Sequence, residues 1–264
     1  MITSSDIREY INNVFPENFA FDRDNVGLIL GRCDKEVKRV LITLDVDEKV
    51  AQEAMEKGAD LIISHHPLMF YPIKRLTGNS PEERTLRQLI SGDISLISAH
   101  TNLDCSSGGL NDYLCEKLDI INTRVIEVVA SDEKGEHGFG RIGEFKEEFS
   151  LLKILERCKN VLGANGLRYT GREDKMIKRV AVNCGGGADL LDECISLGAD
   201  LFITGDVKYN PFRNGYESGM AVIDAGHYET EHIVCELLEK VLKDKYPDIE
   251  FCISKENIAP IKYF

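Results

Sequence analysis

Histidines and carboxylates follow three apolar stretches of the chain, at positions where they could bind a metal ion. The stretches are "LIIS" before "HHP", "ISLIS" before "AHTNLD", and "MAVIDA" before "GHYETE". The candidate ligands are His65, His66, His100, Asp104, His227 and Glu231. Imidazole and carboxylate are the usual ligands of a borderline divalent cation. The sequence therefore predicts a metal site built from these side chains.

The spacing of the candidates favours two ions over one. Successive side chains of a strand point to opposite faces, so His65 and His66 reach a single ion only if the chain has already turned. Otherwise each imidazole binds one of two ions a few ångströms apart, with Asp104 or Glu231 as a bridging carboxylate. His227 and Glu231 are four residues apart and share one face of a helix. Five protein ligands for two ions leave positions for water, as in catalytic sites.

Each candidate also has a structural interpretation when it is taken singly. A pair of histidines is often a surface feature or a satisfied core pair, and Asp104 suits a turn. His100 suits a buried side chain bonded to backbone, and His227 with Glu231 suits a polar helix start. The metal interpretation is favoured because all of them follow predicted strands, whose carboxyl ends face the ligand crevice of open α/β sheets.

An internal repeat indicates which elements position these residues. The stretch 38–69 aligns without a gap with the stretch that begins at residue 178, and both contain "KRV" and "GADL" at matching places. Each runs from an apolar strand through a helix to a second apolar strand, which predicts a parallel β-α-β unit. A third strand follows in both copies. Asp206 occupies the position of His66; the alternatives are an eroded ligand and a surface-loop residue, and the second is favoured.

The predicted fold is α/β, with two similar interlocked lobes related by the internal repeat. Lobe one is assigned residues 1–126 and 227–264, and lobe two residues 127–226. A long amphipathic helix over 229–246 and a last strand over 249–254 are assigned to lobe one, which makes it discontinuous. Ser80, Pro81 and Glu83 predict a helix start with a capping box.

The composition narrows the class of protein. The 264 residues carry 32 basic and 45 acidic side chains, a net charge of −13, which disfavours nucleic acid and membrane as partners. None of the eight cysteines forms a C-x-x-C pair, so we expect reduced, mostly buried thiols. The N-terminus has no apolar secretory region, and no apolar run approaches the roughly 20 residues that span a bilayer. We expect a cytoplasmic protein.

Several motifs together resemble one known family. "DNVGLILG", "SHHPLMF", "AHTNLD", "GFGRIGEF" and "GHYETE" are similar to motifs of the GTP cyclohydrolase I type 2 homologues, in their short form. That family is also called the NGG-interacting-factor-three-like dinuclear metal-centre hexameric proteins. The resemblance covers nearly the whole chain; Arg23 departs from it, since an aromatic residue is more usual before Asp-Asn. By matching position, the family's metal ligands fall on His65, His66, Asp104, His227 and Glu231, and His100 lies beside the site.

The resemblance implies a dinuclear metal site in the cleft between the lobes and a toroidal homohexamer. It also implies hydrolytic opening of the guanine imidazole ring of GTP, by a metal-activated hydroxide that attacks the purine, with His100 or Glu231 moving protons. Zinc is the first expectation for both ions, and iron, manganese or nickel also suit these ligands. The alternatives are another metal-dependent hydrolase, such as a phosphoesterase, and a non-catalytic metal-binding or interaction hexamer.

Overall fold

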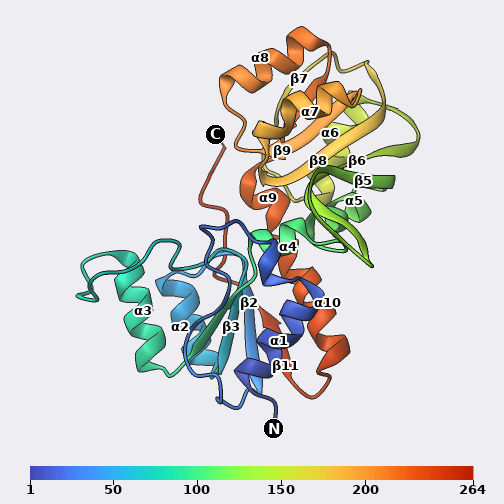
Figure 1. The fold of residues 1–264 in the computed structure, drawn as a ribbon. Helices are drawn as coiled ribbons and strands as arrows, with labels where there is room; N and C mark the ends of the chain where they lie inside the picture. The colour runs from blue at the N-terminus through green and yellow to red at the C-terminus, as the bar shows by residue number, and fades with distance from the viewer. Residues whose placement is uncertain (264) are drawn as a thin grey trace. The chain divides into compact units, whose positions relative to one another are not determined.

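The structure, a computed structural model, describes residues 1–263 and divides the chain into two compact units. Unit 1 comprises Met1–Leu103 with Val234–Ile258, and unit 2 comprises Asp104–Ile233 with the residues from Ala259 onward. Each unit contains its own sheet and its own helices (Figure 1). The predicted α/β class with two lobes is confirmed.

Unit 1 is built on a five-stranded sheet in the order β1-β4-β3-β2-β11. Strand β1 is antiparallel to β4, and the other neighbours are parallel. The strands are β1 (Gly27–Leu30), β2 (Arg39–Thr43), β3 (Leu61–Ser64), β4 (Ser95–Ser98) and β11 (Glu250–Ile253). Every residue of β3 and β4 is buried, as expected for parallel strands that are covered on both faces.

Helices cover both faces of this sheet (Figure 1). Against one face, Val50 and Ala54 of α2 and Leu89 of α3 join a buried cluster with Leu41 and Ile62 of the sheet. Helices α1 and α10 lie on the other side, where Tyr10 and Tyr246 meet edge to face with ring centroids 5.6 Å apart. The helices are α1 (Ser4–Val14), the 3-10 turn η1 (Glu17–Phe19), α2 (Glu48–Lys57), α3 (Pro81–Ser91) and α10 (Val234–Lys245). Helix α4 (Thr101–Cys105) begins in unit 1 and ends in unit 2.

Unit 2 is built on a six-stranded sheet in the order β5-β6-β8-β9-β10-β7. Strands β8, β9 and β10 are parallel neighbours, and the remaining pairs are antiparallel. The strands are β5 (Ile120–Asp132), β6 (Gly135–Ser150), β7 (Arg168–Thr170), β8 (Met176–Gly186), β9 (Leu201–Gly205) and β10 (Ala221–Asp224). The parallel part of this sheet contains the second copy of the repeat.

The helices of unit 2 also lie on both faces of their sheet. One face packs against α7 and α8 through a buried cluster that includes Leu191, Cys194 and Phe202. On the other face, Arg157 of α6 lies over the ring of Phe145, 5.6 Å from its centroid. The helices are α5 (Leu110–Lys117), α6 (Leu151–Val161), the 3-10 turn η2 (Ala188–Leu190), α7 (Leu191–Ser196), α8 (Tyr209–Ser218) and α9 (His227–Glu231). Within residues 1–263, no helix combines the length and the apolar character that a bilayer crossing requires.

The two copies of the repeat have the same strand register. Val40 of β2 pairs with Leu61 of β3, and the matching residue of β8, Val180, pairs with Leu201 of β9. The aspartate of each "GAD" accepts hydrogen bonds from the backbone N–H groups of the lysine and arginine of "KRV". Those bonds are 2.8 and 3.0 Å long at Asp60 and 3.0 and 2.8 Å long at Asp200. "KRV" and "GAD" thus fix the start of both strand pairs.

The structure differs from the sequence-based expectations at several boundaries. The expected division after residue 126 falls inside β5, which belongs to unit 2 because it pairs along its length with β6. The single helix expected over 229–246 is two helices, α9 and α10, separated at His232 and Ile233. The capping box at α3 is also wrong in part. Ser80 accepts from the N–H of Glu83, but the Glu83 carboxylate accepts from Thr77, Gly78 and Asn79 instead.

Candidate metal centre

Three histidines gather beyond the carboxyl ends of β3 and β4 in unit 1. His65 and His66 follow Ser64, the last residue of β3, and His100 follows β4 by two residues. One ligand atom from each of these three residues lies within 4.8 Å of the others. The centroids of the His65 and His66 rings are 5.2 Å apart. The strand ends before His65, so the alternation of strand side chains does not separate the pair.

Each of these histidines is oriented through its Nδ1 atom. His65, which is fully buried, has its Nδ1 2.8 Å from the carbonyl oxygen of Ala99. The Nδ1 of His66 is 2.7 Å from the carboxylate of Asp45, and that of His100 is 2.9 Å from Asp24. A carbonyl or carboxylate oxygen only accepts, so each Nδ1 donates its proton and the lone pair of each neutral ring lies on Nε2. Metal-binding histidines are held by such contacts.

Asp24 connects His100 to the start of α4. Its carboxylate accepts from the backbone N–H and the hydroxyl of Thr101 as well as from His100. Burial acts to raise the pKa of Asp24, but the hydrogen bonds from His100 and Thr101 outweigh it and lower the pKa to about 2. Asp24 is therefore ionised at neutral pH and holds the His100 ring with its Nδ1 protonated.

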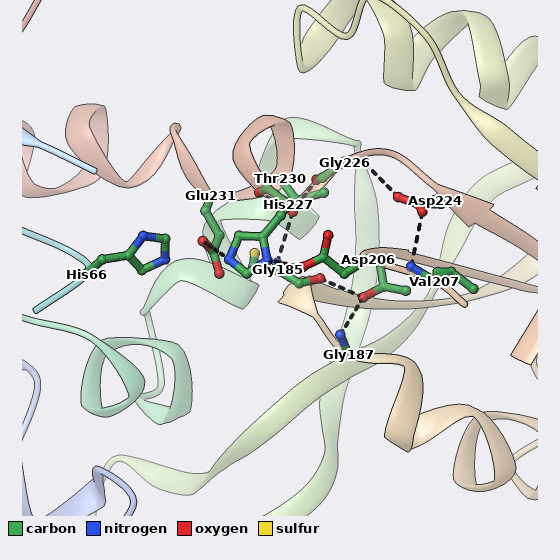
Figure 2. A network of polar contacts seen from close by, with 12 residues as sticks. His66, Gly185, Gly187, Asp206, Val207, Asp224, Gly226, His227, Thr230 and Glu231 are labelled. Atoms are coloured by element: carbon green, nitrogen blue, oxygen red, sulfur yellow. Dashed lines mark hydrogen bonds and ion pairs between the residues drawn. The ribbon is translucent and has the colours of Figure 1, made fainter. Parts of the chain in front are cut away.

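In unit 2, His227 and Glu231 lie four residues apart on the short helix α9, on the same face as predicted. The Nε2 of His227 is 2.9 Å from the Glu231 carboxylate, and its Nδ1 is 2.8 Å from Asp206 (Figure 2). The hydrogen bond to Glu231, opposed by burial and helped by Asp206, raises the pKa of His227 to about 9. The metal-free ring is thus an imidazolium. A cation held by both His227 and Glu231 would replace its Nε2 proton.

Two glycines allow the backbone to approach α9 closely. A β-carbon at Gly185, where φ is +59°, would lie 2.0 Å from an oxygen of Glu231 and 3.2 Å from the Nε2 of His227. A β-carbon at Gly205 would lie 2.7 Å from the backbone nitrogen of His227. The N–H of Gly185 donates to the hydroxyl of Thr230 (Figure 2). The ends of β8 and β9 therefore position His227 and Glu231.

Asp104, the remaining candidate, lies half-buried on α4. Its carbonyl accepts from the Asn111 side chain, which in turn accepts from the N–H of Cys184. Burial raises the pKa of the Cys184 thiol well above its usual range, and the charges of Asp104 and Glu231 act in the same direction. The negative charges of both carboxylates thus raise the pKa of the same buried thiol, near the end of β8.

Three aspartates, Asp24, Asp45 and Asp206, orient the histidines and were not predicted to do so. Asp206 is exposed and lies just beyond β9, as its interpretation as a surface-loop residue requires, and its carboxylate also contacts the Nδ1 of His227. A signal was available for it, since the repeat places Asp206 opposite His66. Asp24 lies in the "DNVGLILG" motif but 76 positions away from His100, so only the fold brings them together.

The donor set is suited to a divalent metal. Unit 1 contains three of the candidate imidazoles, and unit 2 contains one imidazole and the carboxylates of Glu231 and Asp104. Neutral imidazole and carboxylate are ligands of Zn, Fe, Mn and Ni. An oxygen of the chain already holds the Nδ1 of His65, His66, His100 and His227. The groups that could bind a metal, and their orienting partners, are therefore present.

Comparison with known proteins places the chain in a family. The family model for Duf34/NIF3 (NGG1p interacting factor 3) matches residues 2–260. A protein from Clostridium perfringens named GTP cyclohydrolase 1 type 2 homolog is 38% identical over 260 residues, 98% of each chain. NIF3-like protein 1 of Drosophila melanogaster is 34% identical over 243 residues, 89% of this chain and 81% of that protein.

Solved structures share the fold. A Bacillus cereus protein related to NIF3 matches over all of both chains with a TM-score of 0.93 at 24% identity. A hypothetical protein of Staphylococcus aureus matches over 99% of both chains with a TM-score of 0.91 at 29% identity. Reduced HcgD from Methanocaldococcus jannaschii is 30% identical, with a TM-score of 0.77. With the family model matching almost from end to end, the chain belongs to the Duf34/NIF3 family.

Proposed function

We propose that this protein is a dinuclear metal-dependent hydrolase. The proposed ligands of the two divalent ions are His65, His66, Asp104, His227 and Glu231, with His100 beside them. The observation that carries the proposal is the orientation of the histidines: the Nδ1 of each ring donates to an aspartate or a backbone carbonyl. Imidazoles whose Nδ1 is fixed in this way can present Nε2 to a cation.

The ions are proposed to be zinc, with iron, manganese and nickel as the other metals that these ligands accept. When bound, such ions act as Lewis acids and lower the pKa of water to near neutrality. The chain's own residues supply the proton transfers. His100, whose Nδ1 proton is held by ionised Asp24, can accept a proton at Nε2 and release it later. The Glu231 carboxylate, within 2.9 Å of His227, is the second candidate for this role.

GTP is the proposed substrate, because bacterial relatives at 33–38% identity carry the name GTP cyclohydrolase 1 type 2 homolog. The proposed reaction uses two waters: the first opens the guanine imidazole ring at C8 and leaves a formamide, and the second hydrolyses that formamide and releases C8 as formate. We further propose a cytoplasmic homohexamer, with a small-molecule substrate and no nucleic acid partner. Size-exclusion chromatography with light scattering tests the assembly, and a monomer or dimer would contradict it.

The direct test loads purified protein with zinc, iron, manganese or nickel and measures bound metal and formate release from GTP. We expect two ions per subunit and formate from at least one loaded form. His66→Ala and His227→Ala should each lose bound metal and formate together. His232→Ala is the matched control, because His232 follows Glu231 directly and its Nδ1 contacts backbone carbonyls only.

The possible outcomes separate the alternatives. Two bound ions without formate, but with hydrolysis of a phosphoester panel, would replace GTP by another substrate class. Two bound ions with no turnover of any substrate would support a non-catalytic metal-binding hexamer. Full metal binding by His66→Ala would contradict the ligand assignment itself.

A further inference from the structure

A cavity in unit 1 adjoins the histidine cluster. It has a volume of about 560 Å³, and its lining includes His100, Phe21 and Phe70. Phe21 is 58% exposed and Phe70 39% exposed, and the Phe70 ring meets His100 edge to face with centroids 6.4 Å apart. Exposed aromatic rings around a concave surface are unfavourable in water and are typical of a ligand site.

Hydrogen bonds connect the cavity wall to the residues that orient His100. The backbone N–H of Phe21 donates to the Thr101 hydroxyl at 3.1 Å. That hydroxyl and the N–H of Thr101 both donate to Asp24, the carboxylate that holds the Nδ1 of His100. The segment carrying Phe21 is therefore fixed relative to the histidine, so a ligand held by the rings has a defined position beside the imidazole.

The charges at the cavity mouth are those of Asp22 and Arg23. Both residues line the cavity and are exposed. Among residues 1–263, no hydrogen bond or ion pair engages the Arg23 guanidinium. Asp24, the next carboxylate, is already bonded to His100 and Thr101. Arg23 is thus available to an anionic group at the mouth, and Asp22 opposes such a group.

We propose that the cavity lined by Phe21, Phe70 and Arg23 is the substrate-recognition subsite, and that it takes a planar aromatic ring carrying an anionic group. This inference rests on the proposed function, since it places the ring beside the histidines that would carry the chemistry. The aromatic side chains contact the ring through stacking or edge contacts, which tolerate different bases. Arg23 contacts the anion and sets the preference for charged over neutral ligands.

The test uses three probes on zinc-loaded protein in calorimetric titrations: guanosine, GMP and ribose 5-phosphate. Phe70→Leu and Phe21→Leu should each weaken the binding of guanosine and GMP by about fivefold or more, because each variant removes a ring on which the base can stack. Neither should change ribose 5-phosphate. Arg23→Ser should weaken GMP and ribose 5-phosphate and leave guanosine unchanged. Asp22→Asn should tighten the two phosphates.

Two variants far from the cavity are the controls. Tyr216→Ala removes a ring that is 70% exposed on α8, and Arg179→Ser removes an exposed arginine of β8. Both should leave all three affinities unchanged. Unchanged guanosine binding in both phenylalanine variants, or tighter GMP binding in Arg23→Ser, would overturn the proposal. Failure of the hydrolase proposal can be distinguished from failure of this one. If only the hydrolase proposal is wrong, GTP releases no formate, but the three probes still show the expected pattern of binding affinities.

Discussion

The two β-α-β repeats share the register of their strand pairs and differ in the residues that follow their second strands. In unit 1, β3 leads into His65 and His66, whereas in unit 2, β9 leads into Asp206 through Gly205. The third strands also match, because the N–H of Ala99 bonds the carbonyl of Ser64 and that of Ala225 bonds Thr204. These backbone hydrogen bonds are therefore matched in the two units, whereas the residues beyond the strand ends differ in their chemistry.

His66 and Asp206 occupy the same position of the repeat but have different roles: one is a candidate metal ligand, and the other orients a candidate ligand. In unit 1 this position supplies an imidazole, and Asp45, at the end of β2, holds its Nδ1. In unit 2 the same position supplies the carboxylate, which holds the Nδ1 of His227 on α9. One scaffold thus positions either the proposed ligand or its orienting partner, depending on the residue present.

The largest expected effect comes from truncating core side chains at matching positions of the two repeats. Ile63 and Ile203 occupy equivalent strand positions and are both fully buried. Ile63→Ala and Ile203→Ala should each lower the free energy of unfolding of their own unit by about 2–5 kcal/mol. Hydrogen–deuterium exchange in increasing urea reads each sheet separately. A loss in one unit only would show that the scaffolds differ in stability despite their common register.

A smaller effect is expected from the aspartates that cap the strand starts. Asp60→Ala and Asp200→Ala each remove a carboxylate that accepts two backbone N–H groups. We expect a loss of about 1.5–3 kcal/mol in the free energy of unfolding for each, because these are hydrogen bonds to a charged group. The same exchange experiment measures it. Asp244→Asn, at an exposed position of α10, is the control and should change nothing.

The difference in roles can be tested through metal affinity. Asp45→Asn and Asp206→Asn keep a hydrogen-bond acceptor but remove the charge that orients His66 and His227. Asparagine also tolerates the φ of +53° at position 206. Each variant should bind zinc about 10–100-fold more weakly in competition with a chelator. Unchanged affinity for Asp206→Asn would indicate that only unit 1 uses a carboxylate for this purpose.

The smallest expected change in the free energy of unfolding comes from substituting Glu53 of α2 and Glu193 of α7, which occupy matching positions of the repeat. Glu53 is buried, and hydrogen bonds from Ser254 and Lys57 outweigh the effect of burial and lower its pKa, whereas Glu193 is exposed. Glu53→Gln should cost about 1 kcal/mol at pH 7, and Glu193→Gln less than about 0.5 kcal/mol.

The destabilisation caused by Glu53→Gln should depend on pH in a definite direction. A carboxyl with a lowered folded-state pKa contributes stability above its unfolded pKa of about 4.3, and this is lost as the pH falls through the folded value. The difference between wild type and Glu53→Gln, measured by urea unfolding, should therefore shrink between pH 6 and pH 3. A difference that grows on acidification would contradict the assignment.

The repeat could be predicted from sequence because its hydrogen-bonding residues are local. "KRV" and "GAD" act within one β-α-β unit, so the alignment of the copies reported the register directly. The β5–β6 hairpin was not predicted over its full length. Most side chains of β5 are exposed, so the apolar alternation that marks a strand is weak there. The break between α9 and α10 was missed because apolar residues continue at helical spacing through it.

The candidate ligands could be recognised because histidines after apolar strands are rare, whereas their orienting aspartates could not. Single aspartates are common in turns and caps, and nothing local distinguishes Asp24 or Asp45 from those. Their roles depend on contacts between segments far apart in the chain, such as that of Asp24 with His100. Carboxylates of this kind become visible only when the fold is known.

Gly205 limits how the two repeats can diverge during evolution. Any side chain at this position would begin within 2.9 Å of the backbone of His227 and Gly185. A histidine pair like that at positions 65 and 66 therefore cannot arise in the second repeat by substitution while α9 starts at His227. If the two copies descend from one duplicated ancestor, the packing of α9 against Gly205 excluded a side chain at that position. The absence of a histidine pair from the second repeat would then be a difference that single substitutions cannot reverse.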